Sequence, residues 1–216
     1  MTTLSGPMLA PPSGNPPRQA VVLLHGYGAD GNDLIDLGRH WAQTLPDALF
    51  LAPNAPSPCA GGAFGFQWFA LDTAQIDARL VGARDAAPVI HNFLADLWAQ
   101  TGLGPKETFL IGFSQGAMMA LTVGTALEEP LAGIVAFSGA FIAPEGFGEE
   151  RFARTPVALI HGDMDQVVPI GLTHDAAAAL RAAGFDVQVH VSAGTAHGIA
   201  PDGLDVATAF LATHGK

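Results

Sequence analysis

The sequence predicts an α/β fold, in which a mostly parallel central sheet is covered by helices on both faces. Short, uninterrupted apolar runs such as 20–24 and 133–137 are typical of strands buried on both sides. They alternate with segments whose apolar residues recur at helical spacing, most clearly at 85–100. The sequence shows neither a linker nor an internal repeat. We therefore expect a single domain over 1–216 that begins with an extended N-terminal segment, 1–19.

The first elements follow from local composition. Strands are expected at 20–24 and 48–52, because both runs are short and apolar and end at Gly or Pro. The segment between them, 31–45, has helical spacing, with Asn32 or Asp33 as the N-cap.

The middle of the chain combines a long loop with an amphipathic helix. Residues 53–72 are rich in Pro and Gly and carry an aromatic cluster, and loops of this length are often functional. In the helix expected at 85–100, Pro88 fits only within the first turn, and Gly102 ends the helix. The second half is expected to contain strands at 109–111, 133–137, 157–160 and 187–191, and helices after Ser114, at 170–183 and at 203–213.

Composition excludes several classes of function. The chain has 216 residues, of which 49% are hydrophobic, and its 9 basic and 20 acidic residues give a net charge of −11. A nucleic-acid partner or an anionic membrane surface would require a basic patch, so neither is expected. The single cysteine, Cys59, allows no internal disulfide. With no apolar run of membrane-span length and no signal-peptide pattern, we expect a cytoplasmic protein without stable membrane insertion.

Ser114 stands in the pattern Gly112-Phe113-Ser114-Gln115-Gly116, between a predicted strand and a predicted helix. Two glycines permit a tight strand-to-helix turn that exposes the serine hydroxyl at the end of the sheet. A surface serine in an ordinary turn would give the same pentapeptide, but the flanking strand and helix favour a nucleophile.

A serine nucleophile needs donors for the oxyanion that its attack creates. The backbone N–H of Gln115, at the start of the helix, is one candidate. The second is the N–H of Tyr27, in the Gly-rich turn after the first confident strand. His25 in the same turn precedes the serine in the chain and is expected to be a structural hydrogen-bonding residue.

The acid and the base are expected after Ser114, in that order. Asp163 and Asp165 both follow a predicted strand, and we favour Asp165 because it lies deeper in the loop, while Asp163 is the rival and is expected to shape the turn. His197 lies in a loop directly after the last strand, at the same end of the sheet as Ser114. The other histidines that follow Asp165 are placed on a helix, inside a strand and in the tail: His174, His190 and His214.

An apolar cleft beside the serine would hold the substrate. The loop over 61–69 offers Phe64, Phe66 and Trp68 as one wall or a lid. Further wall residues could be Met118, Phe141 and Val168, although core packing is about as good an explanation for Met118 and Phe141. No metal site is expected, because His25 and His161 are not joined by a ligand spacing.

Seven segments together resemble the bacterial carboxylesterase and acyl-protein thioesterase family of α/β-hydrolases, also called phospholipase/carboxylesterases. They are LLHGYGADGNDLIDLG (23–38), APNAP (52–56), QWF (67–69), GFSQGAMMAL (112–121), FSG (137–139), IHGDMDQVVP (160–169) and AHGI (196–199). The resemblance implies an α/β-hydrolase fold, a catalytic triad of Ser114, Asp165 and His197, and oxyanion N–H groups from Tyr27 and Gln115.

The resemblance also implies an activity, namely hydrolysis of carboxylic esters of short to medium acyl chain by a serine enzyme that needs no cofactor. An acyl-protein thioesterase or a lysophospholipase would use the same triad. A non-catalytic binding module of the same fold is disfavoured, because every expected residue type is present in order. A dienelactone-hydrolase-like enzyme would carry Cys in place of Ser114. A homodimer is suggested by the resemblance alone.

Overall fold

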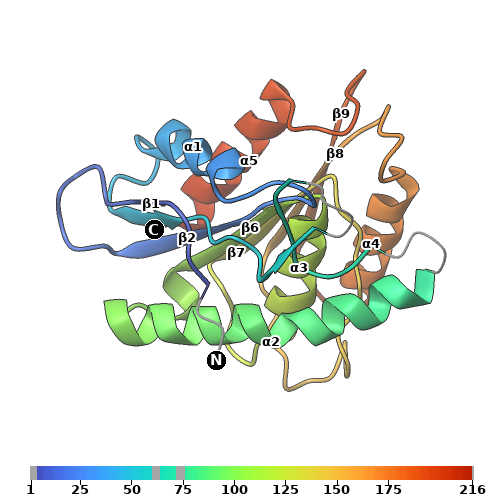
Figure 1. The fold of residues 1–216 in the computed structure, drawn as a ribbon, viewed down its shortest axis with the longest axis horizontal. Coiled ribbons are helices and arrows are strands. Elements are labelled where there is room, and N and C mark those ends of the chain that lie inside the picture. Colours follow the sequence, from blue (N-terminus) through green and yellow to red (C-terminus); the bar gives the residue numbers. More distant parts are fainter. Residues whose placement is uncertain (1–3, 60–63, 72–75, 216) are drawn as a thin grey trace.

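The computed structural model describes residues 4–59, 64–71 and 76–215, and within these ranges seven strands form one sheet (Figure 1). The strands are β1 (Met8–Leu9), β2 (Gln19–Leu24), β3 (Ala48–Leu51), β6 (Thr108–Phe113), β7 (Gly133–Phe137), β8 (Val157–Gly162) and β9 (Val187–Ser192). Their order is β1-β3-β2-β6-β7-β8-β9. Every neighbouring pair is parallel except β1 with β3. The predicted mostly parallel sheet is confirmed.

Helices cover both faces of the sheet. They are α1 (Asn32–Trp41), α2 (Ile76–Thr101), α3 (Gln115–Gly124), α4 (Gly171–Ala182) and α5 (Pro201–His214). Figure 1 shows α1 and α5 on one face and α2, α3 and α4 on the other. A helix lies in every connection between the parallel strands except the one from β7 to β8. Because these strands all run in the same direction, their carboxyl ends lie at the same edge of the sheet.

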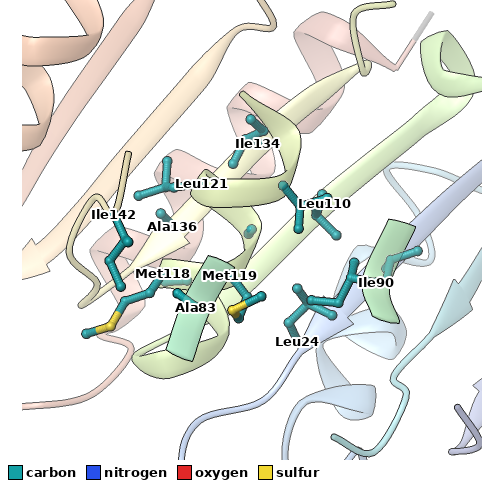
Figure 2. Packing of buried hydrophobic residues seen from close by; sticks show 14 of the residues in the cluster. Leu24, Ala83, Ile90, Leu110, Met118, Met119, Leu121, Ile134, Ala136 and Ile142 are labelled. Carbon is teal, nitrogen blue, oxygen red and sulfur yellow. The ribbon is translucent and has the colours of Figure 1, made fainter. Parts of the chain in front are cut away.

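Two apolar clusters fill the space between the sheet and its helices. Side chains alternate along β2, so that Val21 and Leu23 pack with α1 and α5, while Val22 and Leu24 pack with α2 and α3. Figure 2 shows the second cluster, in which Leu24, Leu110 and Ile134 of the sheet meet Met118, Met119 and Leu121 of α3 and Ile90 of α2. Burial on both faces explains why these strands read as continuous apolar runs.

The segment before residue 19 contains β1, which pairs with β3 at the sheet edge. Helix α1 differs from the sequence prediction: it is shorter than expected, and its N-cap is Gly31, which makes no side-chain cap bond. The side chain of Asp30 accepts the N–H of Asn32 at 2.8 Å, in place of a cap by Asn32 or Asp33.

Helix α2 begins at least nine residues earlier than predicted, and Pro88 lies in its interior. A proline inside a helix removes one hydrogen bond, here the one to the carbonyl of Arg84. Both Pro88 and Arg84 are exposed, so water can satisfy that carbonyl. Gly102 ends the helix as predicted: its φ is +73° and its N–H donates to the carbonyl of Trp98 at 2.9 Å.

The predicted loop at 53–72 contains a short antiparallel hairpin formed by β4 (Ser57–Pro58) and β5 (Phe66–Gln67). Part of this stretch, 60–63 and 72, lies outside the described residues. The backbone of Phe66 accepts from Gly28 at 3.0 Å and donates to Ala29 at 2.8 Å. The hairpin is therefore joined to the turn that follows β2.

Among the helices that the structure describes, none combines the length and the apolar character needed to cross a bilayer.

Candidate active site

Ser114 lies in a strained turn between β6 and α3. Its φ is +53° and its ψ is −117°, and it is the N-cap residue of α3. Serine at an N-cap usually accepts a helix N–H with its hydroxyl. Here the hydroxyl makes no cap bond, so it is free to interact with a residue outside the helix. Strain of this kind costs about 1–3 kcal/mol and concentrates at functional sites.

The two glycines of the pentapeptide are required by close backbone approaches. A Cβ at Gly116 would lie 1.9 Å from the carbonyl oxygen of Leu24, and one at Gly112 would lie 2.2 Å from the carbonyl oxygen of Gly116. No side chain can be accommodated at such distances without moving the backbone. The first turn of α3 thus packs directly against the end of β2, and Ser114 is held at the carboxyl edge of the sheet.

Ser114, His197 and Asp165 are joined by hydrogen bonds in series. The Ser114 hydroxyl donates to Nε2 of His197 at 3.0 Å, and Nδ1–H of His197 donates to Oδ2 of Asp165 at 2.7 Å. The carboxylate acceptor requires the proton on Nδ1, which leaves Nε2 with a lone pair toward the serine. The three side chains come from the loops after β6, β9 and β8, as the carboxyl-end argument predicts.

Asp165 is held as a carboxylate. Its side chain is fully buried, and Oδ1 accepts the backbone N–H groups of Val167 at 2.8 Å and Val168 at 2.9 Å. Burial alone would raise the pKa of Asp165, but the hydrogen bond from His197 and these two N–H groups hold it below its ordinary value. The residue that faces the imidazole is therefore negatively charged at neutral pH.

The loop that carries His197 is hydrogen-bonded to the loop that carries Asp165. Met164 N–H donates to the carbonyl of Thr195 at 2.9 Å, and Gly194 N–H donates to Oδ1 of Asp163 at 2.7 Å. Asp163 thus shapes the turn, whereas Asp165 contacts the imidazole. The ring of Phe113 packs against that of His197, with 4.9 Å between the ring centroids.

The expected oxyanion donors are the residue after Ser114 and the residue after Gly26, where an added Cβ would lie 3.5 Å from Cβ of Ser114. Gln115 is the first residue of α3, so its N–H has no partner within the helix. Tyr27 follows β2, the strand next to β6 in the sheet. Within the described part of the chain, neither backbone N–H donates a hydrogen bond. Two unpaired donors at the nucleophile end of a parallel sheet can stabilise a developing oxyanion.

The other histidines have structural or surface positions. His190 contacts Asp202 at 2.8 Å, His174 is exposed on α4, and His214 packs on Phe210 near the end of α5. None of these three contacts Ser114. Among the described residues, no three His, Cys, Asp or Glu side chains are close enough to bind one metal ion.

Comparison with known proteins assigns the chain to a family. The family model described as phospholipase/carboxylesterase matches residues 10–215, which is nearly the whole chain. The chain belongs to the phospholipase/carboxylesterase family. It is 30% identical to esterase YpfH of Escherichia coli K12 over 85% of this chain and 78% of that protein. It is also 30% identical to acyl-protein thioesterase 1 of Saccharomyces cerevisiae, over 91% of this chain and 92% of that one.

A solved structure agrees with this assignment. The crystal structure of esterase PE8 superposes with a TM-score of 0.92 at 55% identity, covering 97% of this chain and 98% of that chain. The α/β-hydrolase fold predicted for this phospholipase/carboxylesterase is therefore confirmed.

A buried polar network, which the sequence did not predict, lies behind the site of this phospholipase/carboxylesterase. The side chain of Gln115 accepts the N–H of Trp68 at 2.9 Å and donates to the carbonyl of Phe69 at 2.7 Å. The indole N–H of Trp68 donates to the carbonyl of His25 at 2.9 Å. The available signal in the sequence was Trp68, because a buried indole N–H usually has a hydrogen-bond partner.

His25 completes this network, as the structural role predicted for it requires. The fully buried ring accepts the N–H of Ala55 at Nε2, at 3.0 Å, and its Nδ1–H donates to the carbonyl of Gly26 at 2.7 Å. The turns after β2 and β3 and the β5 segment are thus joined through one imidazole and one indole.

The six predicted wall residues fall into two groups. Phe64 is 95% exposed, and Phe66 and Phe141 are half-buried at the edge of the core. The other three have at most 6% of their surface exposed and belong to the core cluster: Trp68, Met118 and Val168. For these three the core-packing explanation accounts for what the structure shows, because each belongs to the apolar cluster on the face of the sheet that α2, α3 and α4 cover. A role in substrate binding stays a prediction for all six.

Proposed function

We propose that this protein is a serine hydrolase that cleaves carboxylic esters of short to medium acyl chain through an acyl-enzyme intermediate on Ser114. The observation that carries the proposal is the hydrogen-bonded series from Ser114 through His197 to Asp165. A serine hydroxyl is a weak nucleophile by itself, and an adjacent base held by a carboxylate is the arrangement that activates it.

In the proposed acylation step, the Ser114 oxygen attacks the carbonyl carbon of the ester. Nε2 of His197 takes the hydroxyl proton, and the negative charge of Asp165 stabilises the imidazolium that forms. The backbone N–H groups of Tyr27 and Gln115 receive the oxyanion of the tetrahedral intermediate. When the intermediate collapses, the ester C–O bond breaks and His197 returns its proton to the leaving alcohol.

Deacylation repeats the same steps with water as the nucleophile. His197 takes a proton from the water, whose oxygen attacks the acyl carbon on Ser114. The second tetrahedral intermediate releases the carboxylic acid, and the proton returns to the Ser114 oxygen. The net reaction is ester plus water to acid plus alcohol.

The acyl substituent is expected to contact apolar side chains next to Ser114. Phe64 and Phe66 support this part of the proposal, because they lie on the hairpin that is bonded to the Tyr27 turn. The same machinery would accept a thioester, since the leaving thiolate needs less protonation than an alkoxide. The similarity to acyl-protein thioesterase 1 supports that alternative, and a lysophospholipid is a third substrate of the same chemistry.

A chain-length series tests the substrate proposal. Hydrolysis of p-nitrophenyl esters from acetate to palmitate, and of matched acyl-thioesters, would be compared by kcat/KM. We expect a maximum at short or medium acyl chains and a preference for the oxygen ester. A maximum at palmitoyl thioesters would instead support the acyl-protein thioesterase alternative.

A fluorophosphonate probe separates an enzyme from a binding module of the same fold. We expect one equivalent of label at Ser114, with Ser114→Ala abolishing both labelling and hydrolysis. His197→Ala should reduce turnover by orders of magnitude in a protein that still folds. A folded wild-type protein that resists the probe would contradict the proposal. The suggested homodimer is a separate prediction, which sedimentation of the purified protein would check.

A further inference from the structure

A second histidine, His161, contacts the carboxylate of Asp165. It lies at the end of β8, with 1% of its surface exposed. Its Nε2 lies 3.2 Å from Oδ2 of Asp165 and 2.8 Å from the carbonyl oxygen of Val168. Its other nitrogen, Nδ1, lies 2.6 Å from the hydroxyl of Thr173 on α4. Neither the proposed reaction nor the buried network behind Gln115 uses this ring.

The surroundings of the ring determine where its proton lies. Nε2 faces two acceptors, a carboxylate oxygen and a carbonyl oxygen, so it must carry hydrogen. The Thr173 hydroxyl, which is itself buried, can donate to the lone pair of Nδ1. A neutral His161 ring therefore has a partner for each nitrogen, and no buried positive charge is needed.

Oδ2 of Asp165 consequently has two imidazole rings beside it: it accepts the Nδ1–H of His197, and the Nε2–H of His161, which donates to the Val168 carbonyl, lies close by. His197 contacts it at 2.7 Å and His161 at 3.2 Å, while Oδ1 is occupied by two backbone N–H groups. The positive end of each N–H dipole lies near Oδ2 and offsets part of its negative charge. The charge that remains to stabilise an imidazolium at His197 is smaller than it would be if His197 alone lay beside Oδ2.

We propose that His161 is a positioning residue that moderates the basicity of His197 through Asp165. Its Nε2–H lies close to Oδ2 and offsets part of the negative charge there, and the ring does not touch the substrate. The inference rests on the proposed hydrolase function, because its consequence is seen in the proton transfers of His197. It predicts that the enzyme with His161 intact works at lower pH than the same triad without it.

Other charged groups do not compete for this role. Asp163, on the same loop as Asp165, is exposed and accepts from Gly194. Helix α4 packs on this side of β8 and contributes the uncharged Thr173, while its His174 and Asp175 are exposed. The loop after β9 contributes His197 itself.

The variants His161→Gln and His161→Met form a matched pair. Both side chains are unbranched and similar in volume, but only glutamine can place an N–H near the position of Nε2. The readout is the pH dependence of kcat/KM for a p-nitrophenyl ester, with folding checked by circular dichroism. We expect the acidic limb of His161→Met to move to higher pH, with KM little changed, and that of His161→Gln to return to the wild-type position. His190→Leu removes another histidine–carboxylate contact, next to β8 on β9, and should leave the profile unchanged.

The possible outcomes are distinct. An acidic limb in the same place for both His161 variants would overturn the inference, and so would a shift to lower pH, which would mean that Asp165 had turned away from His197. If His161→Met does not fold, long-range proton–nitrogen NMR of the wild-type protein decides: the Nε2–H tautomer supports the inference and the Nδ1–H tautomer excludes it. Absence of hydrolysis by the wild-type protein would instead refute the proposed function.

Discussion

The side chain of Gln115 forms two hydrogen bonds with the backbone of the neighbouring residues Trp68 and Phe69. It accepts the N–H of Trp68 at 2.9 Å and donates to the carbonyl of Phe69 at 2.7 Å. The residue whose N–H is proposed to bind the oxyanion thus also holds the hairpin segment that lies against the Tyr27 turn. Gln115 therefore connects the two proposed oxyanion donors, through its own backbone N–H and through the hairpin bonded to the Tyr27 turn.

Gln115→Ala is expected to weaken both stability and turnover. It leaves a buried N–H and a buried carbonyl without partners, which should lower the free energy of unfolding by about 2 kcal/mol. With the hairpin loosened, the Tyr27 N–H is less well placed, and kcat should fall by roughly tenfold or more, toward the range for loss of one oxyanion donor. Urea unfolding and steady-state kinetics measure the two effects. Gln188→Ala, at an exposed position on β9, is the control, and equal behaviour of the two variants would disprove the role of the network.

Asp165→Asn is expected to lower kcat by roughly 10⁴-fold with little loss of folding. The asparagine amide can present N–H to His197, which would then carry its proton on Nε2 and could not accept from Ser114. Asp163→Asn keeps an oxygen for the N–H of Gly194 and should lose little activity. Comparable losses in the two variants would mean that the distinction between the two aspartates is wrong.

Gly116→Ala is expected to be strongly destabilising, because its Cβ would lie 1.9 Å from the carbonyl oxygen of Leu24. Backbone must move to relieve this contact, at a cost of about 3 kcal/mol or more. Gly171→Ala, at the start of α4, meets no atom within 4 Å and should be nearly neutral. Thermal unfolding of both variants checks the prediction, which fails if Gly116→Ala melts with the wild-type protein.

Stability is expected to fall as the pH is lowered below about 6.5, partly because of His25. Burial lowers the pKa of His25, although its contact with the Gly26 carbonyl and the charges of Asp30 and Asp33 oppose this. Below pH 6.5, the ordinary pKa of histidine, His25 binds a proton in the unfolded chain but stays neutral in the folded protein. Protonation of Nε2 in the folded protein would break its hydrogen bond with the N–H of Ala55. The contribution is complete above pH 6.5 and is lost as the pH falls toward the folded-state pKa.

The free energy of unfolding, measured in urea at several pH values, tests this linkage. His25→Gln keeps an acceptor for Ala55 but does not titrate, so its unfolding free energy should depend less steeply on pH between about 6.5 and 5. A residual slope is expected from His91, whose pKa is also lowered by burial. Gln188→Ala, which removes no titratable group, should keep the wild-type slope. An unchanged slope in His25→Gln would show that the protonated ring is tolerated.

Much of the fold could be predicted from local patterns. Continuous apolar runs identified the buried strands, because a strand covered on both faces needs apolar residues at every position, and β7 has the predicted bounds. The order of Ser114, Asp165 and His197 followed from motif and loop position, since each lies just beyond the carboxyl end of a strand. What could not be read locally were the start of α2 and the place of Pro88, where tertiary packing overrides a weak local preference.

The hydrogen-bond partners of the site residues depend on how distant segments of the chain pack together. The sequence places His161 at the end of a strand and says nothing about its partners. Oδ2 of Asp165 lies near its ring because the 165–168 loop folds back over the strand end, and the Thr173 hydroxyl lies near it because α4 packs there. The sequence places Trp68 in a loop, yet its ring is buried in the core, and its indole N–H donates to a carbonyl 43 residues away in the chain. Local sequence determines which groups are available for hydrogen bonds. The partners of these groups depend on which loops lie together at one edge of the parallel sheet. A buried polar group forms its hydrogen bond with the donor or acceptor that the fold places within about 3 Å.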